Sequence, residues 1–261
     1  GGMFARAGLN FRLSQHSSIG VNSFGMISDP KVMGSKDTYT RTYTFTDWLN
    51  PLNNRAYTRE QSGRGWHPGG NVTLDYTLKY DMHQLIVSAM YNNFQWNQEQ
   101  DYIQTEEGRD TTHQLQNNYS HNQHIEIKAD YEWKPTQQSR LEAGYNYSRT
   151  WGTNNSVAYN MFADAQTELY PYYAQFDNIV LNHALYITYG NRFLDKLSIQ
   201  VGLRGEYYMR HLESYYKDNN GTVQDSYAAN PSKQDTAYFQ LFPSAYISYD
   251  FGNGHELQLN Y

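Results

Sequence analysis

Strict alternation of apolar and polar residues is the feature that most constrains the fold of this chain. In residues 71–80 the apolar side chains occupy the even positions and the polar ones the odd positions, and the same period of two runs through 125–133 and 197–209. A helix would scatter these apolar residues around its circumference, whereas a β-strand places them all on one face. The pattern therefore predicts strands that each have one apolar and one polar face.

Ten segments follow this alternation, some more regularly than others. They are residues 3–13, 18–27, 71–80, 85–96, 125–133, 141–149, 179–189, 197–209, 239–251 and 256–261. Several exceed ten residues, whereas strands of soluble sheets usually have five or six. Such lengths suit tilted strands that cross about 30 Å of hydrocarbon.

The connections between these segments alternate in length. Short polar turns are predicted at 14–17, 81–84, 134–140, 191–196 and 252–255, and long connections at 28–70, 97–120, 150–178 and 210–238. An antiparallel up-and-down transmembrane β-barrel has this layout, with short periplasmic turns and long extracellular loops. The Asn220-Gly221 pair suits a hairpin tip, which indicates that strands continue beyond the membrane into the loops.

A soluble β-sandwich, a lipocalin-like barrel or a propeller is the alternative, because alternation also occurs where the apolar face points inward. Strand length and the regular succession of turns and long connections favour the membrane barrel. In that case Leu74, Ile127 and Leu203 point outward into acyl chains, while their polar neighbours line a wet interior. Aromatic residues near strand ends, such as Trp133 and Tyr189, are expected at the boundary between water and lipid.

Composition excludes several other classes of protein. The chain has no cysteine, which rules out disulfide scaffolds, thiolate zinc sites and cysteine nucleophiles. It has 20 Lys and Arg against 26 Asp and Glu, so a nucleic-acid partner is not expected. The mean hydropathy is −0.83 and no apolar run approaches 18 residues, which excludes a transmembrane helix.

The sequence offers no recognisable catalytic, cofactor or metal site, and we do not expect an enzyme. It contains neither a Gly-x-Ser-x-Gly elbow nor a His-Glu-x-x-His motif. His121 and His124 lie three positions apart, so that a strand would direct them to opposite faces, and His113 lies upstream. The acidic stretch in 101–110 lacks the spacing of a calcium-binding loop.

Aromatic side chains in the long connections are the candidates for ligand binding. Such rings suit stacking on sugars or binding of peptides, and packing among the loops explains them equally well. The candidates are Trp96, Tyr102, Trp151, Tyr159, Tyr172 and Tyr173, with Tyr170 beside the last two.

Two segments resemble a known family. Val201-Gly202-Leu203-Arg204-Gly205-Glu206-Tyr207 and Leu241-Phe242-Pro243-Ser244-Ala245-Tyr246-Ile247-Ser248-Tyr249 resemble paired barrel strands of TonB-dependent outer-membrane receptors, and residues 141–148 fit the same pattern. The Tyr- and Asn-rich loops are similar to those of the Bacteroidetes outer membrane protein beta-barrel family. Arg204 and Glu206 are expected on the polar face. Pro243, which cannot donate to a ladder, is expected at a strand start, a bulge or an irregularity.

The resemblance implies a barrel of about 22 strands around an N-terminal plug in the outer membrane of a Gram-negative bacterium. Such a receptor imports a nutrient (a glycan, peptide, siderophore or similar) with energy relayed through TonB. The implied partners are outer-membrane lipid, the plug, the remaining strands and TonB, with a surface lipoprotein as an additional one. Residues 1–261 are expected to be part of this single barrel domain, without its plug and final strands. A surface adhesin or structural barrel is the alternative, and a barrel hydrolase is a third.

Overall fold

The computed structural model describes most of the chain as one β-structure. The described residues are 2–28, 37–45, 55–106, 111–162, 165–168, 174–217, 223–225 and 233–261. All regular secondary structure among them is β-strand. Within these residues, no helix has the length and apolar character needed to cross a membrane.

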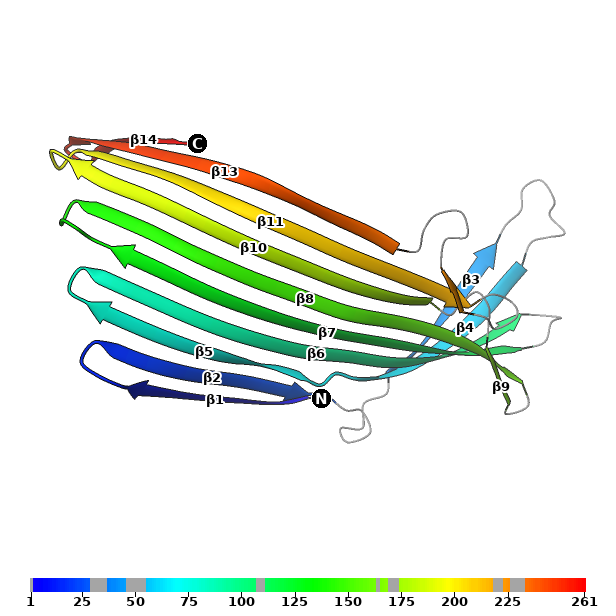
Figure 1. The fold of residues 1–261 in the computed structure, drawn as a ribbon. Helices are drawn as coiled ribbons and strands as arrows, with labels where there is room; N and C mark the ends of the chain where they lie inside the picture. Colours follow the sequence, from blue (N-terminus) through cyan, green and yellow to red (C-terminus); the bar gives the residue numbers. More distant parts are fainter. Residues whose placement is uncertain are drawn as a thin grey trace.

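The strands form one antiparallel sheet (Figure 1). Its main path is β1-β2-β5-β6-β7-β8-β10-β11-β13-β14, while β3 and β4 pair with each other, β4 also with β6, β9 with β8, and β12 with β11. The bounds are β1 Met3–Arg12, β2 Ser17–Ile27, β3 Asp37–Phe45, β4 Arg55–Trp66, β5 Gly69–Tyr80, β6 His83–Glu106, β7 Thr112–Trp133, β8 Ser139–Phe162, β9 Ala165–Glu168, β10 Ala174–Phe193, β11 Leu197–Lys217, β12 Val223–Asp225, β13 Lys233–Gly252 and β14 His255–Asn260. The ten strands of the main path are the ten predicted segments, so the predicted up-and-down order is confirmed.

The predicted outer ends of several strands are wrong, because the hydrogen-bonded ladder continues far into the long connections. β6 has 24 residues and ends at Glu106, ten positions beyond the predicted end. It stays paired with β7 from His83↔Trp133 to Gln104↔Thr112. Polar residues sustain this extension through cross-strand pairs, which do not require an apolar face. The Asn220-Gly221 pair lies outside the described residues.

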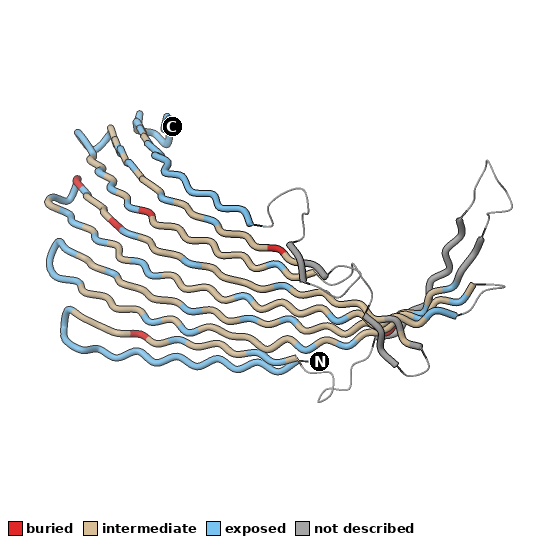
Figure 2. The backbone as a smooth tube through the Cα atoms, turned by 45° about the vertical axis from the view of Figure 1, so that its right-hand side comes forward, coloured by how far each residue is buried: buried red, intermediate tan, exposed pale blue. Residues whose placement is uncertain are grey.

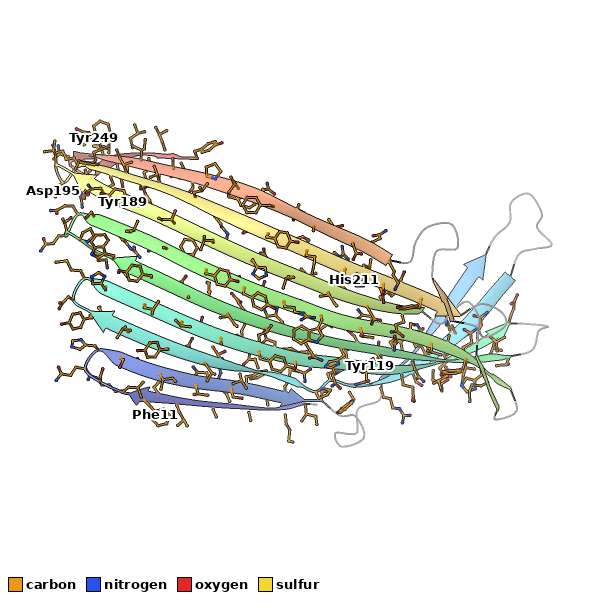
Figure 3. The ribbon with its side chains drawn as sticks, in the orientation of Figure 1. Phe11, Tyr119, Tyr189, Asp195, His211 and Tyr249 are labelled. Carbon is orange, nitrogen blue, oxygen red and sulfur yellow. The ribbon has the colours of Figure 1, made fainter. Side chains whose placement is uncertain are left out.

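The two faces of the sheet differ as the alternation predicts. One register row crosses the sheet from Leu9 through Val21, Leu74, Ala89, Ile127, Tyr147, His183 and Tyr207 to Phe239. We call the face that carries this row the apolar face and the opposite one the polar face. Side chains project from both (Figure 3).

The apolar side chains do not converge on a dry centre. Leu74, Ile127 and Leu203 are 46%, 39% and 46% exposed, and Ala184 is the one buried apolar residue in the described part of the chain. A soluble sandwich or barrel would bury these side chains inside. The arrangement therefore contradicts the soluble alternatives and leaves an apolar face that lipid must cover.

A tyrosine on the polar face reaches across a neighbouring strand. Tyr186 of β10 lies opposite Gly144 of β8, which in turn lies opposite Asp130 of β7. The Tyr186 hydroxyl donates to Asp130 Oδ1 at 2.6 Å, and a Cβ at position 144 would overlap the ring. Gly144 therefore provides the space through which one side chain ties three strands together.

The expectation for Pro243 is wrong. Pro243 lies inside β13, opposite Leu203 of β11, in a register that runs without a shift. Ala245, two residues further on, exchanges both backbone hydrogen bonds with Tyr261, so Pro243 directs its nitrogen to the same side and away from β11. Because β14 pairs with β13 only from position 245 onward, the missing N–H breaks no hydrogen bond of the ladder.

The sheet is open at both edges. Along the main path β1 pairs with β2 alone and β14 with β13 alone among the described residues. Both strands are exposed along their whole length (Figure 2). Unpaired backbone groups at such edges are costly in lipid.

Candidate ligand site on the polar face

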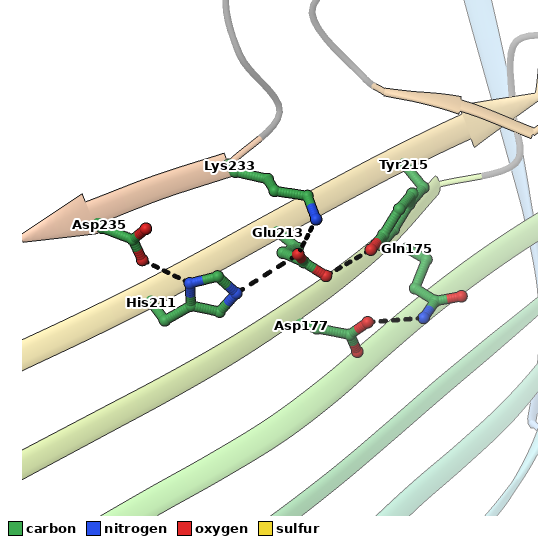
Figure 4. A network of polar contacts seen from close by, with 7 residues as sticks. All are labelled: Gln175, Asp177, His211, Glu213, Tyr215, Lys233 and Asp235. Atoms are coloured by element: carbon green, nitrogen blue, oxygen red, sulfur yellow. Dashed lines mark hydrogen bonds and ion pairs between the residues drawn. The ribbon is translucent and has the colours of Figure 1, made fainter.

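A charged network marks where the apolar face leaves the hydrocarbon. On β10, β11 and β13 this face changes from apolar to charged within two positions, from Ile179 to Asp177, Met209 to His211 and Ala237 to Asp235. Figure 4 shows His211, Glu213, Lys233 and Asp235 joined to one another, with Asp177 beside them and joined to Gln175. A charged side chain is unfavourable in lipid and favourable in water. These charged residues therefore mark the outer boundary of the membrane.

The contacts of this network favour the charged form of its histidine. His211 Nδ1 lies 2.5 Å from Asp235 Oδ1, and its Nε2 lies 3.4 Å from Glu213 Oε1. The Glu213 carboxylate also accepts hydrogen bonds from Lys233 Nζ, at 2.6 Å, and from the Tyr215 hydroxyl. The hydrogen bond from Lys233, followed by that from Tyr215, lowers the pKa of Glu213 to about 2. The hydrogen bond to Asp235, reinforced by its charge and that of Glu213, raises the pKa of His211 above its ordinary 6.5.

The signs of these shifts define a pH window. The contribution of His211 to stability is complete below pH 6.5 and is lost as the pH rises through its raised pKa. That of Glu213 is complete above pH 4.5 and is lost as the pH falls through about 2. Both contributions to stability are therefore complete only between pH 4.5 and pH 6.5.

We expect the Asp235→Asn substitution to lower the pKa of His211 toward 6.5, because it removes the main partner of the imidazolium. Histidine-selective NMR titration of the protein in detergent micelles measures this directly. Asp195→Asn, in the turn at the opposite end of the strands, is the control and should leave the titration unchanged. An unaltered His211 pKa in Asp235→Asn would show that the contact does not form in solution.

On the polar face, just outside this boundary, two aromatic rings lie in one register row. The row runs from Trp96 of β6 through Ser120 of β7 and Asn154 of β8 to Phe176 of β10. Phe176 is the immediate neighbour of Asp177, and a depression of about 290 Å³ lies between the rings. Its lining residues are Trp96, Asn118, Tyr119, Ser120, Asn154, Asn155, Ser156, Ala174 and Phe176.

The local contacts hold one ring and leave the amide of Asn154 available. The ring of His67, from the segment between β4 and β5, lies 3.9 Å from that of Trp96, centroid to centroid. Burial lowers the pKa of His67, so this support is neutral at pH 7. Asn118 Oδ1 accepts from Ser156 Oγ at 2.8 Å, whereas the amide of Asn154 has no hydrogen-bond partner among the described residues.

The structure brings together only part of the predicted aromatic set. Trp96 and Tyr102 share the polar face of β6, with the Arg59 guanidinium 4.0 Å above the Tyr102 ring. Trp151 lies on the apolar face, where Arg149 stands 5.4 Å from its ring, as expected for an aromatic residue at the lipid boundary. Tyr159 lies further out on β8, opposite Leu115. Their binding role stays a prediction, and Tyr170, Tyr172 and Tyr173 lie outside the described residues.

The sequence did not single out Phe176 or the asparagines and serines between the rings. Each comes from a different strand, and only the register places Asn154 and Phe176 in line with Trp96. The sequence signal that could have identified them is their spacing: each lies an even number of residues from the polar positions of its strand, and therefore on the polar face.

The histidines considered as metal ligands have separate partners. His113 pairs with Asp101, His121 Nε2 lies 2.6 Å from Asn93 Oδ1, and His124 Nδ1 lies 2.8 Å from Thr150 Oγ1. His121 and His124 lie on opposite faces, as predicted. Across the described residues, no group of three or more His, Asp or Glu side chains is arranged to hold a metal ion.

The fold and the two faces define a β-barrel of the outer membrane, and the family comparison agrees. The model of the Outer membrane protein beta-barrel family matches residues 76–261. The chain belongs to this family, which confirms the resemblance seen in the sequence and the location in the outer membrane of a Gram-negative bacterium. A comparison with curated proteins finds no match.

A comparison with solved structures finds a similar fold in an outer-membrane receptor. The chain is similar to the ferric yersiniabactin uptake receptor FyuA from Yersinia pestis, at 9% identity and a TM-score of 0.53, over 91% of the chain and 36% of FyuA. The ferric citrate transporter FecA (12% identity, TM-score 0.49, 94% of the chain and 36% of FecA) and the siderophore receptor PiuA from Acinetobacter baumannii (11%, 0.46, 95% and 45%) are also similar. The chain thus spans between a third and a half of the length of these receptors.

Proposed function

We propose that this chain is the barrel part of a TonB-dependent receptor that imports a nutrient across the outer membrane. In this proposal the plug and further strands of the receptor close the open edges of β1 and β14, and TonB supplies energy from the inner membrane. A surface lipoprotein remains an additional partner.

The observation that carries the proposal is the position of the Trp96–Phe176 depression. It lies on the polar face, which lines the interior of a membrane barrel, and just outside the hydrocarbon boundary marked by His211 and Asp235. A ligand that enters from the cell surface would meet this wall before it reached the membrane interior. The similarity in fold to the uptake receptor FyuA supports the same conclusion.

Uptake in cells tests the proposal. A strain that lacks the gene, and a second that lacks TonB, should both fail to grow when one nutrient is limiting, while the wild type grows. The panel of limiting nutrients comprises ferric siderophores, peptides and oligosaccharides. Restoration by the cloned gene in the first strain, but not in the second, is expected because import needs both the barrel and TonB. Normal growth of both mutants on every nutrient would contradict the proposal.

A surface adhesin is the alternative, because β6 and β8, of 24 residues each, far exceed the roughly 9–11 needed to cross the membrane. An adhesin would lose attachment, and not uptake, when its gene is deleted.

We propose no catalytic role. His124 lies between the Thr150 hydroxyl and Glu126 Oε2, but the latter is 3.9 Å away. The neighbouring backbone N–H groups belong to ladders and are not free to stabilise an oxyanion.

A further inference from the structure

Among the described residues, β6, β7, β8 and β10 contribute no formal charge to the polar face around the depression. On β6, β7, β8 and β10, the polar-face residues within two positions of the Trp96–Phe176 row are amides, small residues, a hydroxyl and one aromatic ring. They are Phe94, Gln98, Asn118, Asn122, Gly152, Ser156, Ala174 and Asn178. The carboxylates of Asp177 and Glu213 are close in sequence but lie on the opposite face.

Deeper in the membrane the same face is strongly charged, and these charges end before the level of the depression. Its charged residues there include Glu126, Lys128, Asp130, Arg204 and Glu206. The guanidinium of Arg210, which lies opposite Val180 and so two polar-face positions inward of Phe176, donates to Asn178 Oδ1 at 3.0 Å. Among the described residues, an anionic ligand at the depression would thus meet one cation, which already donates to Asn178, whereas a site for carboxylates or phosphates normally offers several.

The groups that are present suit hydroxyls. Side-chain amides and hydroxyls both donate and accept hydrogen bonds, as a sugar hydroxyl does. Asn154 stands between the two rings without a partner among the described residues. The flat rings of Trp96 and Phe176, 51% and 41% exposed, offer apolar faces for the C–H surface of a sugar ring.

The spacing of the rings indicates a chain-like ligand. Three strand-to-strand steps separate Trp96 from Phe176, which is about 14 Å at the usual spacing. A single six-membered ring is shorter than this backbone separation. A ligand that extends from one strand to the other must therefore be longer than one sugar unit.

We propose that the Trp96–Phe176 depression binds an uncharged oligosaccharide. This inference rests on the proposed receptor function, and it specifies the class of ligand that the receptor takes. The two aromatic rings stack on separate sugar units, and the amides and hydroxyls between them, with Asn154 at the centre, bind the sugar hydroxyls.

Binding of neutral oligosaccharides to the whole receptor in detergent tests the proposal. An array of neutral glycans is compared with anionic glycans, a peptide library and ferric siderophores, and hits are measured by calorimetry. We expect binding among the neutral glycans, weakened about tenfold or more by Trp96→Ala or Phe176→Ala. Trp133→Ala, the same change on the apolar face at the opposite end of β7, is the matched control and should keep full affinity.

Folding and function are separated by further readouts. Resistance of each variant to unfolding in sodium dodecyl sulfate shows that the barrel is intact, and Phe176→Tyr, which keeps a ring, should retain most of the affinity. Exclusive binding of anionic glycans, peptides or siderophores would overturn the inference, as would full affinity in both alanine variants. TonB-dependent uptake of another nutrient would leave the receptor function standing without this ligand. Neutral-glycan binding without any uptake would refute import and retain the ligand class.

Discussion

Replacing Leu203 by arginine is expected to destabilise the barrel by about 2–4 kcal/mol, the usual cost of a cation on the lipid side at the bilayer midplane. Leu203 lies midway along the apolar run 197–209 of β11, on the apolar face, between Ile187 and Pro243. An arginine there must bring water into the hydrocarbon or distort the strand. Urea titration of the whole receptor in lipid vesicles measures the loss.

Two other arginine substitutions on β11 make the comparison specific. Gln200→Arg places the same side chain on the polar face and should change stability little. Met209→Arg lies on the apolar face but next to the charged row of His211, so a cost of about 0–1 kcal/mol is expected. Equal losses for all three variants would mean that β11 does not face lipid in the inferred orientation.

The Gly144→Ala substitution is expected to destabilise the protein by about 2–3 kcal/mol. A methyl group at this position overlaps the ring of Tyr186, so the ring must leave and its hydroxyl loses Asp130. Overpacking and a lost hydrogen bond to a carboxylate each contribute on the order of 1–3 kcal/mol. The change is measured by the same urea titration.

A double-mutant cycle isolates the role of the ring. In a Tyr186→Leu background the clash is relieved, and Gly144→Ala should then be close to neutral. Gly190→Ala on β10 is the control glycine, because a Cβ there meets its neighbours only at ordinary contact distance. If Gly144→Ala were equally harmful with leucine at position 186, backbone conformation and not ring packing would explain the glycine.

The period of two in the sequence made the main path of the sheet predictable. It identified the ten strands, their antiparallel order and the two faces, because each apolar residue of a strand must lie on the lipid side. It failed where alternation is no longer needed. Beyond position 96, most residues of β6 are polar on both faces, and its strand conformation is maintained by pairing with β7 and β4.

The candidate site was predictable only in part. Trp96 was predicted as a candidate because it is an aromatic residue at a long connection. The residues that line the depression with it depend on the strand register, which a sequence of alternating residues does not specify. Trp151 was predicted for the same reason, as an aromatic residue of a long connection, but it lies on the opposite face of the sheet. Counting in steps of two from the apolar residues of each strand distinguishes the faces of the two tryptophans. This count holds beyond the membrane only if the strands continue without a bulge.

The paired strands that extend beyond the membrane change the energetics of ligand capture. Ordering a flexible loop on binding costs about 1–2 kcal/mol for each residue that becomes fixed. Trp96, Asn154 and Phe176 are held in a ladder between neighbouring strands before any ligand arrives. Their backbone is ordered when the protein folds, so association should resemble docking onto a rigid surface, with little entropy lost by the receptor itself.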